Sequence, residues 1–189
     1  MTHRNQLEAA RTVLLVVDLQ ERFRSVISDF DEIVARSARL IRTFRILDLP
    51  IVVTEQYPKG LGPTVVEVRE ALSFPGAPEV PVLEKTVFSA CGAAGIRKKL
   101  PDSSGLGVLV CGIEAHVCVN QSVHDLLEAG QAVHVAVDAV GSRRESDREV
   151  ALRKMERSGA VLTTSEMAAF ELLADARHLR FKEVQALYK

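Results

Sequence analysis

The stretch Thr12-Val13-Leu14-Leu15-Val16-Val17 contains five apolar residues in succession, and Asp18 follows it directly. A run that is apolar at consecutive positions is typical of a strand buried on both faces, as in a parallel sheet covered by helices. Five further runs rich in Val, Ile and Leu lie at residues 51–54, 80–83, 106–111, 132–137 and 160–162. The sequence therefore predicts a mostly parallel sheet of six strands.

The segments between these runs have the spacing of amphipathic helices. Residues 31–47 repeat apolar side chains close to every 3.6 positions, namely at Ile33, Val34, Ala38, Leu40, Ile41, Phe44 and Leu47. Four further helices are predicted at residues 117–129, 147–158, 164–173 and 175–189. Either Thr164 or Ser165 is the N-cap of the third of these. Alternating strands and helices predict a single α/β domain over residues 1–189, with three layers in the order αβα.

Residues 56–81 are the least regular segment, with five of the seven prolines and three of the eleven glycines. Proline and glycine interrupt regular structure, and a long loop inside a compact domain is often functional. The sequence predicts a loop here, and leaves open whether it is a lid over a ligand site or a contact between subunits.

The charges nearly cancel, because 24 Lys and Arg residues face 25 Asp and Glu residues and the net charge is −1. A dedicated nucleic-acid binder usually carries a basic face, so no nucleic-acid partner is predicted. No apolar run approaches the roughly 18–20 residues of a membrane-spanning helix. Residues 1–12 also lack the apolar core of a signal peptide. These features predict a cytoplasmic protein that binds a small molecule, with no membrane partner.

The three cysteines, Cys91, Cys111 and Cys118, are an odd number and form no Cys-x-x-Cys pair. A secreted disulfide framework favours an even number, so reduced cysteines are predicted. Cys111 lies inside an apolar run and is interpreted as a buried core residue. The role of Cys91 stays open.

Polar side chains follow the first four predicted strands. Asp18 follows the first strand, Lys85 follows the third, and Cys118 comes shortly after the fourth. Ligands of open α/β sheets bind beyond the carboxyl ends of the strands. A carboxylate, an ammonium and a thiol are therefore expected to converge there.

Such a group of side chains can carry out nucleophilic acyl transfer. A helix start at Cys118 and a nearby Lys85 are each expected to lower the pKa of the thiol. Asp18 can accept the thiol proton and later donate it to a leaving group. Each residue also has a structural interpretation: Asp18 as a cap or turn former, Lys85 as a solvated surface residue, and Cys118 as inert packing.

Three motifs carry a resemblance to a known family. They are Leu15-Val16-Val17-Asp18-Leu19-Gln20 with Phe23, Glu84-Lys85-Thr86-Val87-Phe88-Ser89, and Gly112-Ile113-Glu114-Ala115-His116-Val117-Cys118-Val119. Over most of its length the chain resembles the isochorismatase-like cysteine hydrolases, which include nicotinamidases and N-carbamoyl amidases. The cysteine motif and residues 54–62 are most similar to the isochorismatase domain-containing subgroup, whose physiological substrate is generally unassigned.

The resemblance implies a parallel six-stranded sheet between helices and a catalytic triad of Asp18, Lys85 and Cys118. It also implies a cis peptide bond between Ile113 and Glu114, and an oxyanion hole made by the backbone N–H groups of Glu114 and Cys118. Relatives are commonly dimers or larger, so a homo-oligomer is predicted. The side chains predicted to line the pocket are Gln20, Phe23, Gln56, Tyr57, Phe88 and His116.

The chain departs from two branches of the family. Nicotinamidases carry an Asp-x-His metal motif after the second strand, where this chain has Glu55-Gln56-Tyr57, and no histidine occurs between His3 and His116. No metal ion and no cofactor is therefore predicted. Isochorismatases that cleave a vinyl ether lack the cysteine, so Cys118 indicates hydrolysis of a carbon–nitrogen bond through a thioester.

The sequence thus predicts a metal-independent cysteine hydrolase of a small amide-type substrate. Two alternatives stay open. One is a non-catalytic binding or interaction protein that keeps the fold, and the other is a protein that uses its thiols in redox chemistry.

Overall fold

Six parallel strands form one sheet in the computed structural model, which describes residues 3, 5–100 and 106–189. The strands are β1 (Thr12–Val17), β2 (Ile51–Gln56), β3 (Val82–Lys85), β4 (Gly107–Ile113), β5 (Ala132–Gly141) and β6 (Val161–Thr163). Their order in the sheet is β3-β2-β1-β4-β5-β6. All six predicted strands are confirmed, and every pair of neighbouring strands is parallel.

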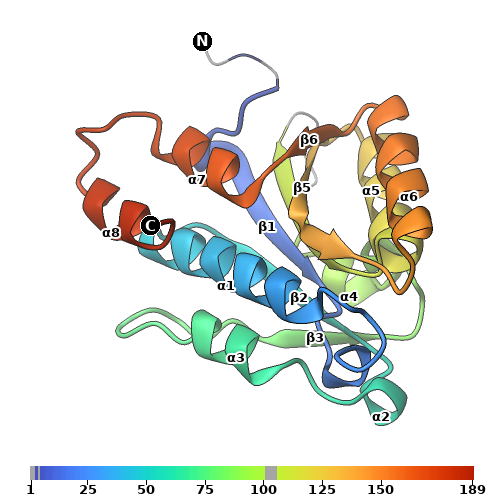
Figure 1. Ribbon diagram of the computed structural model, residues 1–189. Helices are drawn as coiled ribbons and strands as arrows, with labels where there is room; N and C mark the ends of the chain where they lie inside the picture. Colours follow the sequence, from blue (N-terminus) through green and yellow to red (C-terminus); the bar gives the residue numbers. More distant parts are fainter. Residues whose placement is uncertain (1–2, 4, 101–105) are drawn as a thin grey trace.

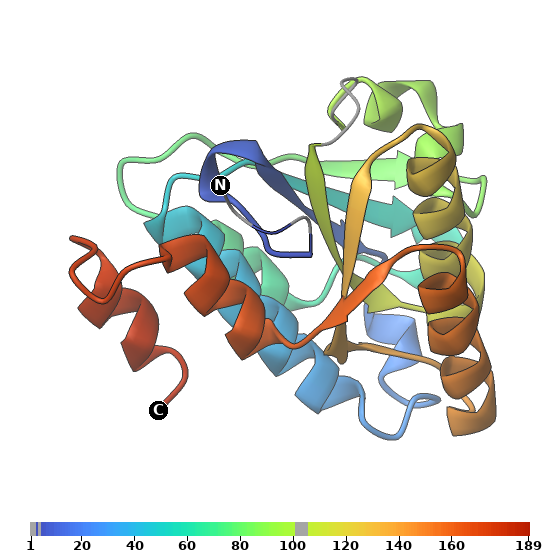
Figure 2. The same ribbon diagram turned by 90° about the horizontal axis from the view of Figure 1, so that it is seen from above.

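Helices cover both faces of this sheet (Figure 1, Figure 2). One face carries α1 (Phe30–Ile46), α3 (Val66–Leu72) and α7 (Ser165–Leu173), with α8 (Phe181–Ala186) packed on their outer side. The other face carries α4 (Ala94–Arg97), α5 (Asn120–Glu128) and α6 (Glu145–Arg157). The predicted αβα layers are confirmed. No helix within the described ranges has the length and apolarity needed to cross a membrane.

Strand β1 is apolar at almost every position because both of its faces are covered. Leu14 and Val16 pack into the core on the side of α1, whereas Val13, Leu15 and Val17 pack into the core on the side of α5. Alternate residues of a strand point to opposite faces. The run of consecutive apolar residues in β1 is therefore shared between two cores.

The predicted helices also form, and the structure settles one N-cap. The Oγ1 atom of Thr164 accepts a hydrogen bond from the backbone N–H of Met167 at 3.2 Å. Ser165 instead donates its hydroxyl to Asp138 Oδ2 at 2.5 Å. Thr164 is thus the cap of α7, because its side chain satisfies one of the unpaired N–H groups of the first turn.

The segment at residues 56–81 is more regular than predicted. It contains α2 (Pro58–Leu61) as well as α3, which buries one of its faces beside α1. The prediction of one long loop was wrong because proline does not always interrupt a helix. Pro58 is the first residue of α2, a position where its missing N–H removes no helical hydrogen bond.

Strands β1 and β4 approach each other so closely at their carboxyl ends that one position requires glycine. Gly112 pairs with Val17 and has a φ of +115°, and a Cβ atom added to Gly112 would lie 2.0 Å from the carbonyl oxygen of Val17. Only glycine adopts such a φ without strain. This contact fixes the distance between the chain at Asp18 and the turn that follows β4.

We expect Gly112→Ala to lower the free energy of unfolding by at least about 3 kcal/mol, because the added methyl group overlaps the backbone of β1. Urea denaturation followed by circular dichroism measures the loss. Gly95→Ala in α4 is the control, since nothing lies within 4 Å of a Cβ atom added there. Equal unfolding midpoints for the two variants would contradict the account of this contact.

Candidate active site

Four neighbouring strands bring the predicted catalytic residues to one edge of the sheet. β3, β2 and β1 end at or just before Lys85, Gln56 and Asp18, and the turn after β4 carries Cys118. Because the sheet order is β3-β2-β1-β4, these four ends lie next to one another. Asp18 and Lys85 meet in this way although 67 positions separate them along the chain.

Asp18 and Lys85 form a buried ion pair, in which Lys85 Nζ lies 2.6 Å from Asp18 Oδ2. The other carboxylate oxygen, Oδ1, accepts a hydrogen bond from Thr54 Oγ1 at 2.7 Å. Lys85 Nζ also donates to Gln56 Oε1 at 2.7 Å and to the carbonyl oxygen of Phe88 at 2.9 Å. An ammonium group has three N–H donors, so each of them has an acceptor, as a buried charge requires.

Cys118 lies beside this pair in a π-helical turn, Ala115–Val119, that leads into α5. The residue is only 6% exposed, and its Sγ atom is 4.0 Å from Gln56 Oε1. Burial and the Asp18 carboxylate raise the pKa of the Cys118 thiol to about 12, against the opposite effect of Lys85. The expectation of a lowered pKa was wrong, because desolvation and the negative charge of Asp18 outweigh the ammonium. Cys118 is a neutral thiol at neutral pH.

Gln20 and Gln56, both predicted to line the pocket, differ in what their side chains contact. Gln20 is fully buried, accepts a hydrogen bond from the Gln56 backbone N–H at 2.8 Å and donates to the Gln56 carbonyl oxygen at 3.1 Å. Gln56 Nε2 donates to the carbonyl oxygen of Thr86 at 2.7 Å. Gln20 therefore holds the backbone of β2, and the side chain that reaches Lys85 and Cys118 is that of Gln56.

Tyr57 and Phe88 lie at the surface next to the ion pair, with 54% and 52% of each residue exposed. Tyr57 borders a cavity of about 440 Å³, which is also lined by Pro58, Lys59, Glu84, Lys85, Thr86, Val87, Gly92 and Ala93. The backbone N–H of Tyr57 donates to the carbonyl oxygen of Lys85 at 2.8 Å. The Tyr57 side chain is thus available to a ligand in this cavity, whereas Phe88 is exposed but is not one of the residues that line it.

Phe23 and His116 are half-buried, and the contacts that the structure shows for their side chains are with residues outside the triad. Phe23 packs against the hydrophobic core on the side of α1. His116 Nδ1 is 3.0 Å from Ser142 Oγ. The structure gives neither side chain a hydrogen bond or ion pair with Asp18, Lys85 or Cys118 among the residues that it describes.

The peptide bond between Ile113 and Glu114 is cis. The buried side chain of Glu114 accepts hydrogen bonds from Arg143, from Nε at 2.9 Å and from the backbone N–H at 3.1 Å. These contacts tie the start of the Cys118 turn to the chain that follows β5.

Sequence reasoning missed Thr54, Ser122 and the carbonyl group of Phe88. Thr54 ends an apolar run and is the first residue of segment 54–62, where the sequence assigned it no role, but it orients Asp18. Ser122 donates its hydroxyl to the carbonyl oxygen of Cys118 at 2.7 Å, one helical turn back. The only signal in the sequence for Thr54 was its place two residues before Gln56, which puts both side chains on the same face of a strand.

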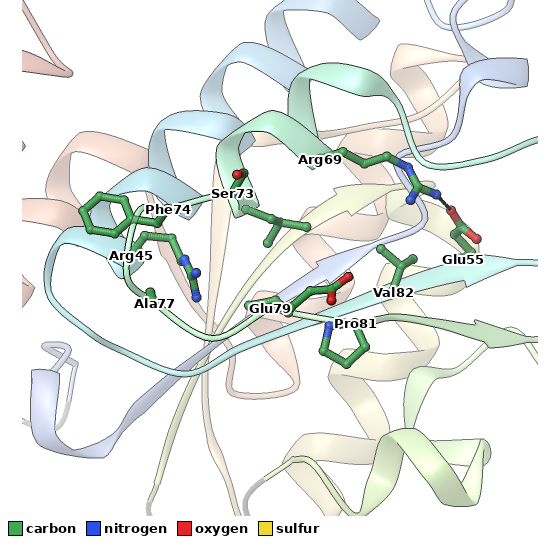
Figure 3. Close-up of a pocket in the computed structure, with 11 residues that line it drawn as sticks. Arg45, Glu55, Arg69, Ser73, Phe74, Ala77, Glu79, Pro81 and Val82 are labelled. Carbon is green, nitrogen blue, oxygen red and sulfur yellow. Dashed lines mark hydrogen bonds and ion pairs between the residues drawn. The ribbon is translucent and has the colours of Figure 1, made fainter.

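Glu55 occupies the place where nicotinamidases begin their metal motif, and its side chain is engaged elsewhere. Glu55 Oε1 accepts hydrogen bonds from the backbone N–H of Thr64 at 2.5 Å and from Arg69 Nη2 at 2.8 Å. Figure 3 shows this ion pair at the border of a second cavity of about 630 Å³. Within the described part of the chain, no three His, Cys, Asp or Glu side chains come together as a metal site.

The helices, the parallel sheet and the polar carboxyl edge place the chain in the class of α/β proteins that bind a ligand at the ends of their strands. The chain belongs to the isochorismatase family, because the model of the isochorismatase domain matches residues 12–167. It is 46% identical to isochorismatase domain-containing protein 2A of Mus musculus over 179 residues, which cover 94% of this chain and 82% of the relative. The fold of this family supports a hydrolase role.

Two solved structures extend the comparison. The structure of the MAR1 ribonuclease from Caenorhabditis elegans has a TM-score of 0.89 and 47% sequence identity, and the match covers 96% of this chain and 91% of that chain. YcaC from Pseudomonas aeruginosa, solved with hexane-2,5-diol and covalent acrylamide, has a TM-score of 0.81 and 25% identity, with 100% of both chains covered.

We expect Lys85→Met to lower the free energy of unfolding by about 3–5 kcal/mol, because it leaves the Asp18 carboxylate buried without its cation. The double variant Asp18→Asn/Lys85→Met removes both charges and is expected to recover part of this loss. Urea denaturation measures both effects. Arg177→Met, which breaks the exposed ion pair with Asp175, is the control and should change the midpoint little. A Lys85→Met variant as stable as the wild type would contradict the buried pair.

We expect alkylation of Cys118 by iodoacetamide to rise about tenfold per pH unit from pH 8 to pH 10.5, because the thiolate fraction still grows below a pKa near 12. Peptide mass spectrometry at fixed times measures the rate, and circular dichroism verifies that the protein stays folded. The urea-unfolded protein is the control, in which the alkylation rate of Cys118 should stop rising once the pH passes the ordinary thiol pKa. A plateau below pH 9 in the folded protein would show an activated thiolate instead.

Proposed function

We propose that this protein is a single-domain cysteine hydrolase of small amide-type compounds. Cys118 is the nucleophile, Asp18 is the general base and acid, and Lys85 holds Asp18 in place. The observation that carries the proposal is the buried contact between Lys85 Nζ and Asp18 Oδ2, at 2.6 Å, directly beside the Cys118 thiol. A thiol next to a carboxylate that can accept its proton is the arrangement that nucleophilic catalysis requires.

Acylation begins from the neutral thiol. As Sγ attacks the carbonyl carbon of the amide, the thiol proton passes to Asp18 and the carbonyl electrons move to the oxygen. The oxyanion then collapses, the carbon–nitrogen bond breaks, and the leaving amine takes the proton from Asp18. Because burial raises the pKa of the Cys118 thiol to about 12, little thiolate forms beforehand, and the proposed proton transfer accompanies the attack. The product of this step is a thioester on Cys118.

Deacylation uses the same carboxylate again, first as the base and then as the acid. Asp18 accepts a proton from a water molecule, and the resulting oxygen attacks the thioester carbon. The carbon–sulfur bond breaks, and Sγ takes the proton back from Asp18, so the enzyme returns to its starting state. We assign the oxyanion in both steps to the backbone N–H groups of Glu114 and Cys118.

Lys85 keeps Asp18 ready for both proton transfers. Its three N–H groups are used by Asp18, Gln56 and the Phe88 carbonyl oxygen. The ammonium therefore remains fixed while the charge of Asp18 changes during the cycle. Thr54 holds the second carboxylate oxygen, at 2.7 Å.

The substrate is proposed to be small. Asp18, Lys85 and Cys118 are all buried, which leaves little room for a large substrate. The cavity of about 440 Å³ that Lys85 borders, and that Asp18 and Cys118 do not line, is within the range of small-molecule sites. The covalent acrylamide in the P. aeruginosa YcaC structure is a small molecule, which supports a substrate of this size. A homo-oligomer and a cytoplasmic location remain predictions from the sequence.

Cleavage of RNA is the second candidate function, because the C. elegans relative is described as a ribonuclease. The near-neutral charge of the chain and the burial of the three groups favour a small substrate over a polyanion. The same assay decides between them when an RNA oligonucleotide is tested beside the amides.

We expect a panel of small amides to contain at least one compound that the wild type hydrolyses, and Cys118→Ala to reduce its turnover by at least about a thousandfold. Product release measured by mass spectrometry reports the rate. Cys91→Ala is the matched control, since Cys91 is a partly exposed cysteine outside the ion pair, and it should retain turnover.

Three outcomes would overturn the proposal. Ligand binding without turnover that depends on Cys118 would favour a non-catalytic binding protein. Sulfenic acid formed at Cys118 under mild peroxide, again without amide turnover, would favour redox chemistry. RNA cleavage that is lost in Cys118→Ala would favour the ribonuclease function.

A further inference from the structure

We propose that Ser122 and Asp125 of α5 are positioning residues for this reaction. They clamp residues 89–91 to the turn that carries Cys118. Residues 89–91 directly follow Val87 and Phe88, whose carbonyl groups lie beside the Lys85 ammonium. The inference deepens the proposed hydrolase function and rests on it. It assigns a role to side chains that lie outside the three motifs and do not touch the reacting groups.

Ser122 joins the two segments through a single hydroxyl group. It is fully buried, and its Oγ donates to the carbonyl oxygen of Cys118 at 2.7 Å. The same Oγ accepts a hydrogen bond from the backbone N–H of Ala90 at 2.8 Å. A hydroxyl has one donor and two acceptor positions, so both bonds form together. The peptide group of the nucleophile is thereby linked to the chain beyond Lys85.

Asp125 holds the same segment one helical turn further along α5. Its Oδ2 accepts a hydrogen bond from Ser89 Oγ at 2.6 Å. Ser89 Oγ in turn accepts from the backbone N–H of Cys91 at 3.1 Å. The bond to a carboxylate is charge-assisted and stronger than a bond between neutral groups. Two side chains of one helix therefore fix residues 89–91 from two points.

The clamped residues directly follow the carbonyl groups that lie beside Lys85. Lys85 Nζ donates to the carbonyl oxygen of Phe88 at 2.9 Å and lies 3.5 Å from that of Val87. These two residues immediately precede Ser89. Val87 is 45% exposed and Phe88 is 52% exposed, so little apolar packing holds them. The hydrogen bonds from α5 therefore help to hold these carbonyl groups around the ammonium, which Asp18 and Gln56 also bind.

This arrangement makes α5 a common support for both partners of the reaction. Cys118 lies in the turn that leads into α5, and Lys85 is held through residues 88–91, which α5 also holds. Small displacements of reacting groups reduce rates steeply, whereas they change ligand binding much less. Loss of the clamp is therefore expected to slow the chemical step at Cys118 and to leave ligand affinity nearly unchanged.

Labelling of Cys118 by acrylamide tests the clamp without any hydrolysis. In this reaction the Cys118 Sγ bonds to the terminal carbon of the acrylamide double bond, and the thiol proton ends on the neighbouring carbon. Intact-protein mass spectrometry gives the rate at saturating acrylamide and the concentration of half-saturation. Hydrogen–deuterium exchange of residues 86–92 reports independently whether the segment has been released.

We expect Ser122→Ala and Asp125→Ala to reduce the saturating rate about 10- to 100-fold, with the half-saturating concentration changed less than about twofold. Both variants should also speed exchange of residues 86–92. Asp125→Asn keeps a carbonyl oxygen that can accept from Ser89, so it should label within about threefold of the wild type. Glu128→Gln, an exposed carboxylate on the same helix, is the matched control and should behave as the wild type.

Two results would overturn the inference. One is wild-type labelling by Asp125→Ala although exchange shows that the segment has opened. The other is Asp125→Asn as slow as Asp125→Ala, which would show an effect of charge and not of the hydrogen bond. Because Asp125 is at the surface, the comparison of Asp125→Ala with Asp125→Asn decides the question even if Ser122→Ala fails to fold. If the clamp variants lose labelling but no amide is hydrolysed, the hydrolase proposal fails and the positioning of Cys118 stands.

Discussion

The structure of the site depends on one buried ion pair, between Lys85 and Asp18. Removing two charges from water costs several kcal/mol for each ion unless hydrogen bonds compensate it. Thr54, Gln56 and the Phe88 carbonyl group supply those bonds here. They come from β2 and from the chain after β3, so the pair requires the neighbouring order of β3, β2 and β1 that the sheet provides.

Burial beside the same pair determines the state of the nucleophile. Cys118 is buried next to a carboxylate, and the pKa of its thiol is raised to about 12. A neutral thiol is a weak nucleophile, but the Asp18 carboxylate, which adds to the effect of burial on the pKa, is also the group that can accept the thiol proton. The proposed chemistry therefore relies on a proton transfer at the moment of attack. The raised pKa also keeps the thiol mostly protonated, and so slow to react with other electrophiles, when no substrate is bound.

Much of this architecture follows from the sequence. Apolar residues at consecutive positions of β1 predict coverage on both faces, and the rule that ligands bind beyond the carboxyl ends of strands brings Asp18, Lys85 and Cys118 together. The direction of the Cys118 pKa shift does not follow, because it depends on the depth of burial and on the distance to Asp18. Those quantities exist only in the folded chain.

The contacts that support the site are also hidden from the sequence. Ser122 and Ala90 are 32 positions apart, and no local pattern relates a serine on a helix to an N–H group in a turn. Gln20 and Gln56 look equally suited to line a pocket, yet one holds backbone and the other reaches Lys85. Prolines in residues 56–81 indicate a loop, although Pro58 begins a helix.

The central claim is that Cys118 forms a covalent acyl intermediate with help from Asp18. The most direct test mixes the wild type with an amide that it hydrolyses, quenches the reaction rapidly with acid and measures the mass of the intact protein. The account predicts a transient mass increase equal to the acyl group, located on the Cys118 peptide, and much slower formation of this adduct in Asp18→Asn. Steady turnover with no acyl group on Cys118 at any time would contradict it.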